Sequence, residues 1–118
     1  MILVVGGLGA GKKCYVRETL GYREDDIAKE IHDEKAVLLD LQEYIRQAGT
    51  FREEWFAALC TKQVVVCNEV GCGVVPVDAE ERRWRDDVGR ACARLAAEAS
   101  AVVRVSCGVP QAIKGVLP

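Results

Sequence analysis

Four short apolar runs constrain the fold of this chain more than any other feature of its sequence. They cover residues 1–5, 36–40, 64–67 and 101–106. Each has the length and the β-branched or leucine content of a buried strand, and segments with helical character separate them. This alternation favours a parallel α/β sheet of about four or more strands with helices on both faces. Right-handed crossovers would then bring the carboxyl ends of the strands to one edge.

Length and composition narrow the class of protein. The chain has 118 residues, the size of one domain, so we expect residues 1–118 to fold as a single unit. Hydrophobic residues make up 50% and charged residues 29%, a balance typical of a compact core rather than of disorder. The formal net charge of −2 argues against general binding to nucleic acid. No apolar run approaches the roughly 20 residues of a membrane span, and the N-terminus lacks a basic leader, which predicts a cytoplasmic protein.

Six cysteines are spread along the chain without a C-x-x-C pair. Because a cytosol keeps thiols reduced, we expect no disulfide framework. His32 is the only histidine, so a zinc site is poorly supported. Cys67 and Cys107 lie in or after apolar runs, and we expect them to be small core residues.

The first apolar run leads directly into a glycine-rich segment that fits the phosphate-binding pattern G-x-x-x-x-G-K. Glycines allow the backbone to turn its N–H groups inward around an anion, and the lysine of the pattern would reach the outer phosphates of a nucleotide. The alternative is an ordinary glycine turn before a surface lysine. The candidate nucleotide-binding residues of this loop are Gly6, Gly7, Leu8, Gly9, Ala10, Gly11, Lys12 and Lys13.

Lys13 departs from the pattern, which has Ser or Thr after the lysine so that a hydroxyl can hold Mg²⁺. An ammonium group cannot ligate a metal ion and repels one nearby. Phosphate affinity could survive, because Lys13 adds positive charge.

The other strand candidates also end in polar or glycine residues. Asp40 ends the second run, in the position of an acidic residue that binds Mg²⁺ directly or through water. Asn68 and Glu69 end the third run, and residues 106–108 end the fourth. An open parallel sheet binds ligands beyond the carboxyl ends of its strands, so we expect a nucleotide site at this edge rather than four unrelated strand ends.

Helices are expected between the strand candidates, at residues 14–20, 24–35, 41–47, 51–59 and 79–99. Asp78 is a good N-cap for the last helix, in which apolar residues recur at spacings of three and four. Arg104 lies inside the fourth strand candidate and suggests a strand at a sheet edge. Residues 109–118 show one turn and little other regular structure.

The segment that follows the third run reads Asn-Glu-Val-Gly-Cys-Gly-Val-Val-Pro, residues 68–76. It resembles the N-E-V-G-x-G-[IV]-V-P signature of the adenosylcobinamide kinase/adenosylcobinamide-phosphate guanylyltransferase family. Residues 83–97 resemble the family's R-x-[FW]-R-D…G-R…R-L-A-A helix, and residues 6–12 its phosphate loop. The specific part of the resemblance is the signature, since the loop occurs in many nucleotide-binding proteins.

The resemblance implies a phosphate-loop NTPase-like enzyme of cobalamin biosynthesis. Members phosphorylate a hydroxyl of adenosylcobinamide with ATP or GTP, then transfer GMP from GTP to that phosphate through a guanylylated histidine. Mg²⁺ is expected, and members assemble as trimers. By this resemblance Lys12 would stabilise charge on the transferring phosphoryl group, Asp40 would hold Mg²⁺, and His32 would carry GMP, while Asn68 and Glu69 lie on the signature.

The chain also lacks parts of the family pattern. It is shorter than the usual domain, and a strand of the V-x-Y-[IV]-A-T type is missing between Gly21 and Asp25. These differences and Lys13 leave a second hypothesis open: a degenerate, non-catalytic member that binds nucleotide or a protein partner. A third hypothesis is another small-molecule kinase with a different acceptor.

Overall fold

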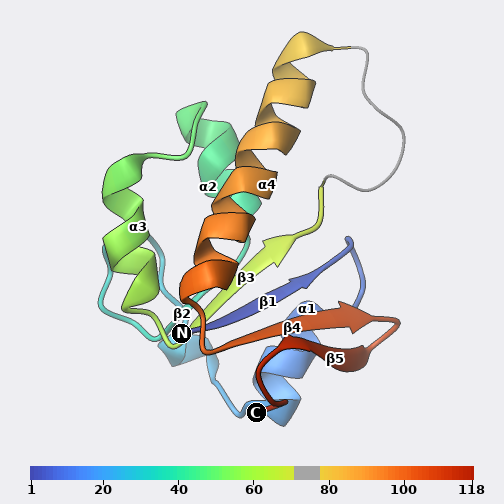
Figure 1. Ribbon diagram of the computed structural model, residues 1–118. Helices are drawn as coiled ribbons and strands as arrows, with labels where there is room; N and C mark the ends of the chain where they lie inside the picture. The colour runs from blue at the N-terminus through green and yellow to red at the C-terminus, as the bar shows by residue number, and fades with distance from the viewer. Residues whose placement is uncertain (71–77) are drawn as a thin grey trace.

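The computed structural model describes residues 1–70 and 78–118 and contains a sheet with helices on both faces (Figure 1). The described strands form one sheet in the order β2-β3-β1-β4-β5. Their bounds are β1 Ile2–Gly6, β2 Val37–Leu38, β3 Val64–Asn68, β4 Ala101–Ser106 and β5 Val109–Lys114. The α/β class and the four strands predicted from the apolar runs are thereby confirmed.

Strands β1 to β4 are parallel, as predicted, and β1 lies in the centre with β3 on one side and β4 on the other. The fifth strand was not predicted. It pairs antiparallel with β4 through a turn in which Cys107 and Gly108 have φ angles of 51° and 75°. Two consecutive positive φ angles match the twist of a tight hairpin, so the end of the chain returns along β4 instead of forming an irregular tail.

The prediction that Arg104 marks an edge strand is wrong, because β4 lies between β1 and β5. The charge is tolerated in this position because the Arg104 guanidinium is exposed and forms an ion pair with Glu69 at 2.9 Å. A neighbouring carboxylate, rather than a sheet edge, accounts for the charged residue in the strand.

The helices divide between the two faces of the sheet (Figure 1). Helices α2, α3 and α4 pack on one face, and α1 with the π-helical turn η1 packs on the other. None of the described helices is both long and apolar enough to cross a membrane. The bounds are α1 Lys12–Cys14, η1 Tyr15–Thr19, α2 Leu41–Ala48, α3 Glu53–Cys60 and α4 Ala79–Glu98.

The predicted helix over residues 24–35 is wrong. Only one 3-10 turn, η2 (Glu24–Asp26), forms there. Ile27 then bridges to Val37 beside the sheet, and Ile31 enters the core. The two isoleucines are four residues apart, as expected for one face of a helix. Ile27 instead pairs with Val37 beside the sheet, so the helix does not continue past this residue.

The core consists of two layers on opposite faces of the sheet. In β1, Leu3 and Val5 pack under helices α2–α4, whereas Val4 faces η1. On α4 the predicted apolar stripe is confirmed, since its buried residues Val88, Ala91 and Leu95 all face the sheet. Asp78 caps this helix by accepting a hydrogen bond from the Glu80 N–H group.

Candidate functional site

Three of the four glycines at residues 6–11 are required by the local backbone. Gly9 and Gly11 have φ angles of 73° and 99°, a region that favours glycine. A Cβ atom on Gly6 would lie 2.5 Å from the Val105 carbonyl oxygen of β4. The sequence pattern therefore corresponds to a tight turn held between the end of β1 and the neighbouring strand.

Lys12 follows this turn and is the first residue of α1. It is only 6% exposed, and its Nζ donates a hydrogen bond to the Gly7 carbonyl oxygen at 2.6 Å. Burial lowers the pKa of this ammonium group, and the nearby Asp40 carboxylate opposes that effect. The Lys12 ammonium thus lies over its own loop, where a phosphate oxygen could replace the Gly7 carbonyl as hydrogen-bond acceptor.

A cavity of about 340 Å³ lies beside the loop. Besides residues 8–14 it is lined by Asp40 and Asn68, which come from the ends of β2 and β3. The structure therefore brings together predicted residues from three strand ends. A concave site in which a small number of polar and charged groups converge is the usual arrangement of a small-ligand site.

Asp40 and Asn68 are joined through Gln42, a residue that sequence reasoning missed. Gln42 is only 3% exposed. Its Nε2 donates to Asp40 Oδ1 at 3.3 Å, and its Oε1 accepts a hydrogen bond from the Asn68 N–H group at 2.9 Å. The available signal was an amide in the first turn of a helix that directly follows a strand end.

Asp40 itself precedes α2 with a φ angle of 57°, a left-handed conformation that aspartate tolerates better than most residues. Its Oδ2 atom lies 2.9 Å from Lys13 Nζ. Lys13, which stands where the pattern has a hydroxyl, thus also neutralises Asp40, the expected metal ligand.

This donor set does not fit a Mg²⁺ ion at Asp40, because the carboxylate is already paired with an ammonium group and no hydroxyl stands at position 13. In the part of the chain that the structure describes, no group of three or more His, Cys, Asp or Glu side chains could hold a metal ion. The metal role expected for Asp40 is therefore not supported by its surroundings.

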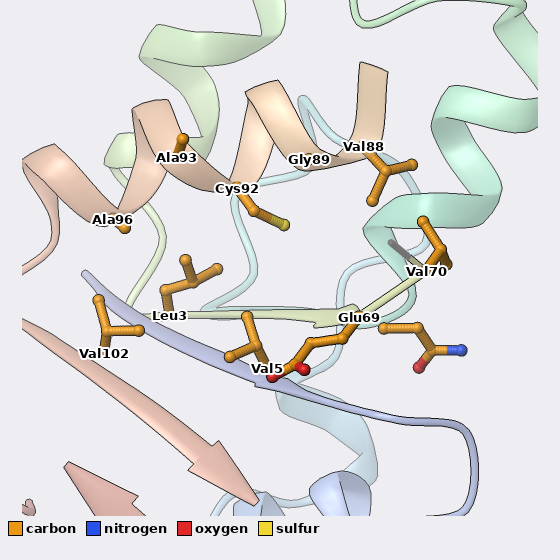
Figure 2. Close-up of a pocket in the computed structure, with 11 residues that line it drawn as sticks. Leu3, Val5, Glu69, Val70, Val88, Gly89, Cys92, Ala93, Ala96 and Val102 are labelled. Carbon is orange, nitrogen blue, oxygen red and sulfur yellow. The ribbon is translucent and has the colours of Figure 1, made fainter. Parts of the chain in front are cut away.

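Glu69 faces a second cavity, also of about 340 Å³, between α4 and the sheet. Figure 2 shows Val88 and Cys92 of α4 projecting toward Leu3 and Val5 of β1 across this space. The Glu69 carboxylate is paired with Arg104 and does not line the phosphate-loop cavity. Asn68 lines both cavities, whereas Glu69 lines only the cavity between α4 and the sheet.

The cysteines follow the prediction in part. Cys67 is fully buried in β3, as expected, and its thiol donates to the Asn68 carbonyl oxygen at 3.6 Å. Interaction with the neighbouring Cys92 thiol, together with burial, raises the pKa of Cys67 well above its usual value. Cys107 is exposed in the hairpin turn, so the expectation that it belongs to the core is wrong.

His32 is exposed in a turn after the buried Ile31. Within the described part of the chain it lines neither of the two cavities. The Tyr44 hydroxyl donates to the Lys29 carbonyl oxygen at 3.1 Å and ties this segment to α2. Residues 71–76 of the predicted signature lie outside the described residues.

Comparison with known proteins identifies the family. The sequence profile of the cobinamide kinase / cobinamide phosphate guanyltransferase family matches residues 26–113. The phosphate loop precedes that range, so it is supported by its own geometry.

The bifunctional adenosylcobalamin biosynthesis protein CobU of Salmonella typhimurium strain LT2 is 47% identical to this chain over 53 residues. That alignment covers 45% of this chain and 29% of the relative, so the chain matches less than a third of the relative's length. Because the family profile spans most of the sequence, and because the sheet has the expected parallel α/β architecture, this chain belongs to the cobinamide kinase / cobinamide phosphate guanyltransferase family.

Proposed function

We propose that this chain binds GTP or ATP at its phosphate loop and acts as a nucleotide-dependent kinase and nucleotidyltransferase in cobalamin biosynthesis. The observation that carries the proposal is the buried Lys12 ammonium, which lies over the glycine loop in a cavity shared with Asp40 and Asn68. Family membership supplies the acceptor, a cobinamide, and the two reaction types.

Phosphoryl transfer depends chiefly on positioning and on neutralising charge at the phosphates. Lys12 would supply the neutralising charge, because its Nζ can exchange the Gly7 carbonyl for a phosphate oxygen. Asp40 would hold the neighbouring Lys13 ammonium in place through their 2.9 Å ion pair. His32 would accept GMP, a role supported by its place in the family resemblance and by its exposure.

A second candidate function is nucleotide binding without turnover. The Lys13–Asp40 ion pair favours it, because this contact occupies the carboxylate that a metal-assisted enzyme would use. The two functions share the same ligand and differ in whether the nucleotide is consumed.

The test is calorimetric titration with GTP and ATP, followed by incubation with adenosylcobinamide. We expect Lys12→Met to weaken nucleotide binding by about tenfold or more, because a charge-assisted hydrogen bond is lost. Lys29→Met removes an exposed lysine outside the phosphate-loop cavity and is the matched control.

Folded wild-type protein that binds neither nucleotide would refute the proposal. Binding with phosphorylation of adenosylcobinamide would support the enzyme, whereas binding with no product would favour the second function. If His32 carries GMP, labelled GTP should leave protein-bound GMP on the wild type and none on His32→Asn; equal labelling of both would remove that role.

A further inference from the structure

We propose that the Lys13 ammonium group takes the place of a divalent metal ion beside Asp40, so that the site recognises the polyphosphate of a metal-free nucleotide. This inference rests on the proposed nucleotide-binding function and adds the ionic form in which the ligand is bound. Its starting point is the contact between Lys13 and Asp40, at 2.9 Å.

The geometry positions the carboxylate that pairs with this cation. Asp40 is fixed by its position before α2 and by the hydrogen bond from Gln42, which is itself buried and bonded to the Asn68 N–H group. Lys13 directly follows Lys12, and both side chains line the cavity beside the glycine loop. The second ammonium therefore stands between the loop and the strand-end carboxylate, where a loop hydroxyl and an aspartate would otherwise share a metal ion.

The charges of the cavity favour an anion over a cation. The residues that line it contribute two ammonium groups, from Lys12 and Lys13, and one carboxylate, from Asp40. Two positive charges and one negative charge leave a formal charge of +1. Cys14 adds no negative charge, because a thiol is largely neutral at pH 7 and the nearby Glu18 raises the pKa of this one further. A divalent cation entering this place would have to displace Lys13 from Asp40 and would be repelled by both lysines.

The Lys13 side chain is nevertheless free to reach a ligand. It is 53% exposed, and the Asp40 side chain is 34% exposed, so solvent weakens their attraction. Phosphate oxygens could therefore share the ammonium with Asp40 without a buried ion pair being broken. A nucleoside triphosphate carries more negative charge without Mg²⁺ than with it, so a cavity with net positive charge binds the metal-free form better.

The test is calorimetric titration of the whole chain with GTP, ATP and inorganic tripolyphosphate, each in EDTA and in excess Mg²⁺. We expect the wild type to bind at least as tightly in EDTA as in Mg²⁺. Lys13→Ser should lose about tenfold in metal-free affinity and gain a dependence on Mg²⁺. Arg17→Ser is the matched control, because it removes a similarly exposed cation whose partner, Glu24 at 2.8 Å, lies outside the cavity.

Two results would overturn the inference while leaving nucleotide binding intact. One is wild-type affinity that Mg²⁺ strengthens by about tenfold or more. The other is metal-free affinity that is unchanged in both Lys13→Ser and the second variant Lys13→Gln, with folding checked by circular dichroism. Folded wild type that binds none of the three probes would instead refute the proposed nucleotide site itself, and this inference with it.

Discussion

Replacing Gln42 with methionine tests how the ends of two strands are held together at the cavity. The substitution keeps nearly the same volume, so no void is created. It removes both side-chain hydrogen bonds, the one donated to Asp40 Oδ1 and the one accepted from the Asn68 N–H group. The backbone carbonyl of Gln42, which accepts from Trp84 Nε1 at 2.9 Å, is unchanged.

The size of the effect follows from the surroundings of these two bonds. The Asn68 N–H group is partly buried, and a buried donor without a partner costs about 1–3 kcal/mol. The bond to Asp40 is longer, at 3.3 Å, and that carboxylate is 34% exposed, so water can replace the donor at little cost. We therefore expect a loss of about 2 kcal/mol, which for a domain of this size lowers Tm by about 8 °C.

The assay is urea unfolding at neutral pH, with thermal denaturation as a second measurement. The midpoint should fall while the slope m stays constant, because the surface exposed on unfolding is the same. Gln47→Met is the matched control, since it makes the same change at an exposed position of the same helix. If Gln42→Met destabilises the protein no more than Gln47→Met does, Gln42 does not join the two strand ends energetically.

Two further predictions concern the loop and a surface ion pair. Gly6→Ala should destabilise the fold by about 1–3 kcal/mol and weaken nucleotide binding, because the added Cβ atom would meet the Val105 carbonyl oxygen. Thermal denaturation measures the loss of stability, and titration measures the loss of binding. Gly7→Ala is the control and should be tolerated, because its Cβ atom would meet no atom within 4 Å. The hydrogen bond from Arg94 lowers the pKa of Glu53 below its ordinary 4.5, so this pair stabilises the fold above pH 4.5 and is lost as pH falls through the lower folded-state value. Glu53→Gln should therefore lower Tm at neutral pH, and the difference from wild type should shrink below pH 4.5; a constant difference would contradict the assignment.

The parts of the fold that follow from local patterns were predictable. The four parallel strands come from apolar runs, and the buried face of α4 comes from its spacing of apolar residues. The structure of the segment after Gly21 was not predictable, because the backbone of Ile27 pairs with Val37 beside the sheet and a periodic pattern does not reveal that partner. Strand β5 was missed because most of its side chains are exposed and only pairing with β4 makes it a strand.

The candidate site likewise has a part that the sequence predicted and a part that it did not. The phosphate loop could be recognised because its glycines and Lys12 are neighbours in sequence. The contacts of Lys13 with Asp40, and of Gln42 with Asn68, join segments that only the folded sheet brings together. The sequence indicated which residues are candidates for the site. It did not indicate which charged groups pair, because that depends on where each connection between strands begins and ends in the folded sheet, and no local pattern specifies those positions.

The central place of β1 has a consequence for the order of folding. Its neighbours in the sheet, β3 and β4, come from the middle and the end of the sequence, and the Ala10 carbonyl of the loop accepts a hydrogen bond from the Gly108 N–H group at 2.8 Å. Each of these contacts closes a long stretch of chain and carries a corresponding entropic cost. We therefore expect the glycine loop to be completed late in folding, although it lies near the start of this sequence.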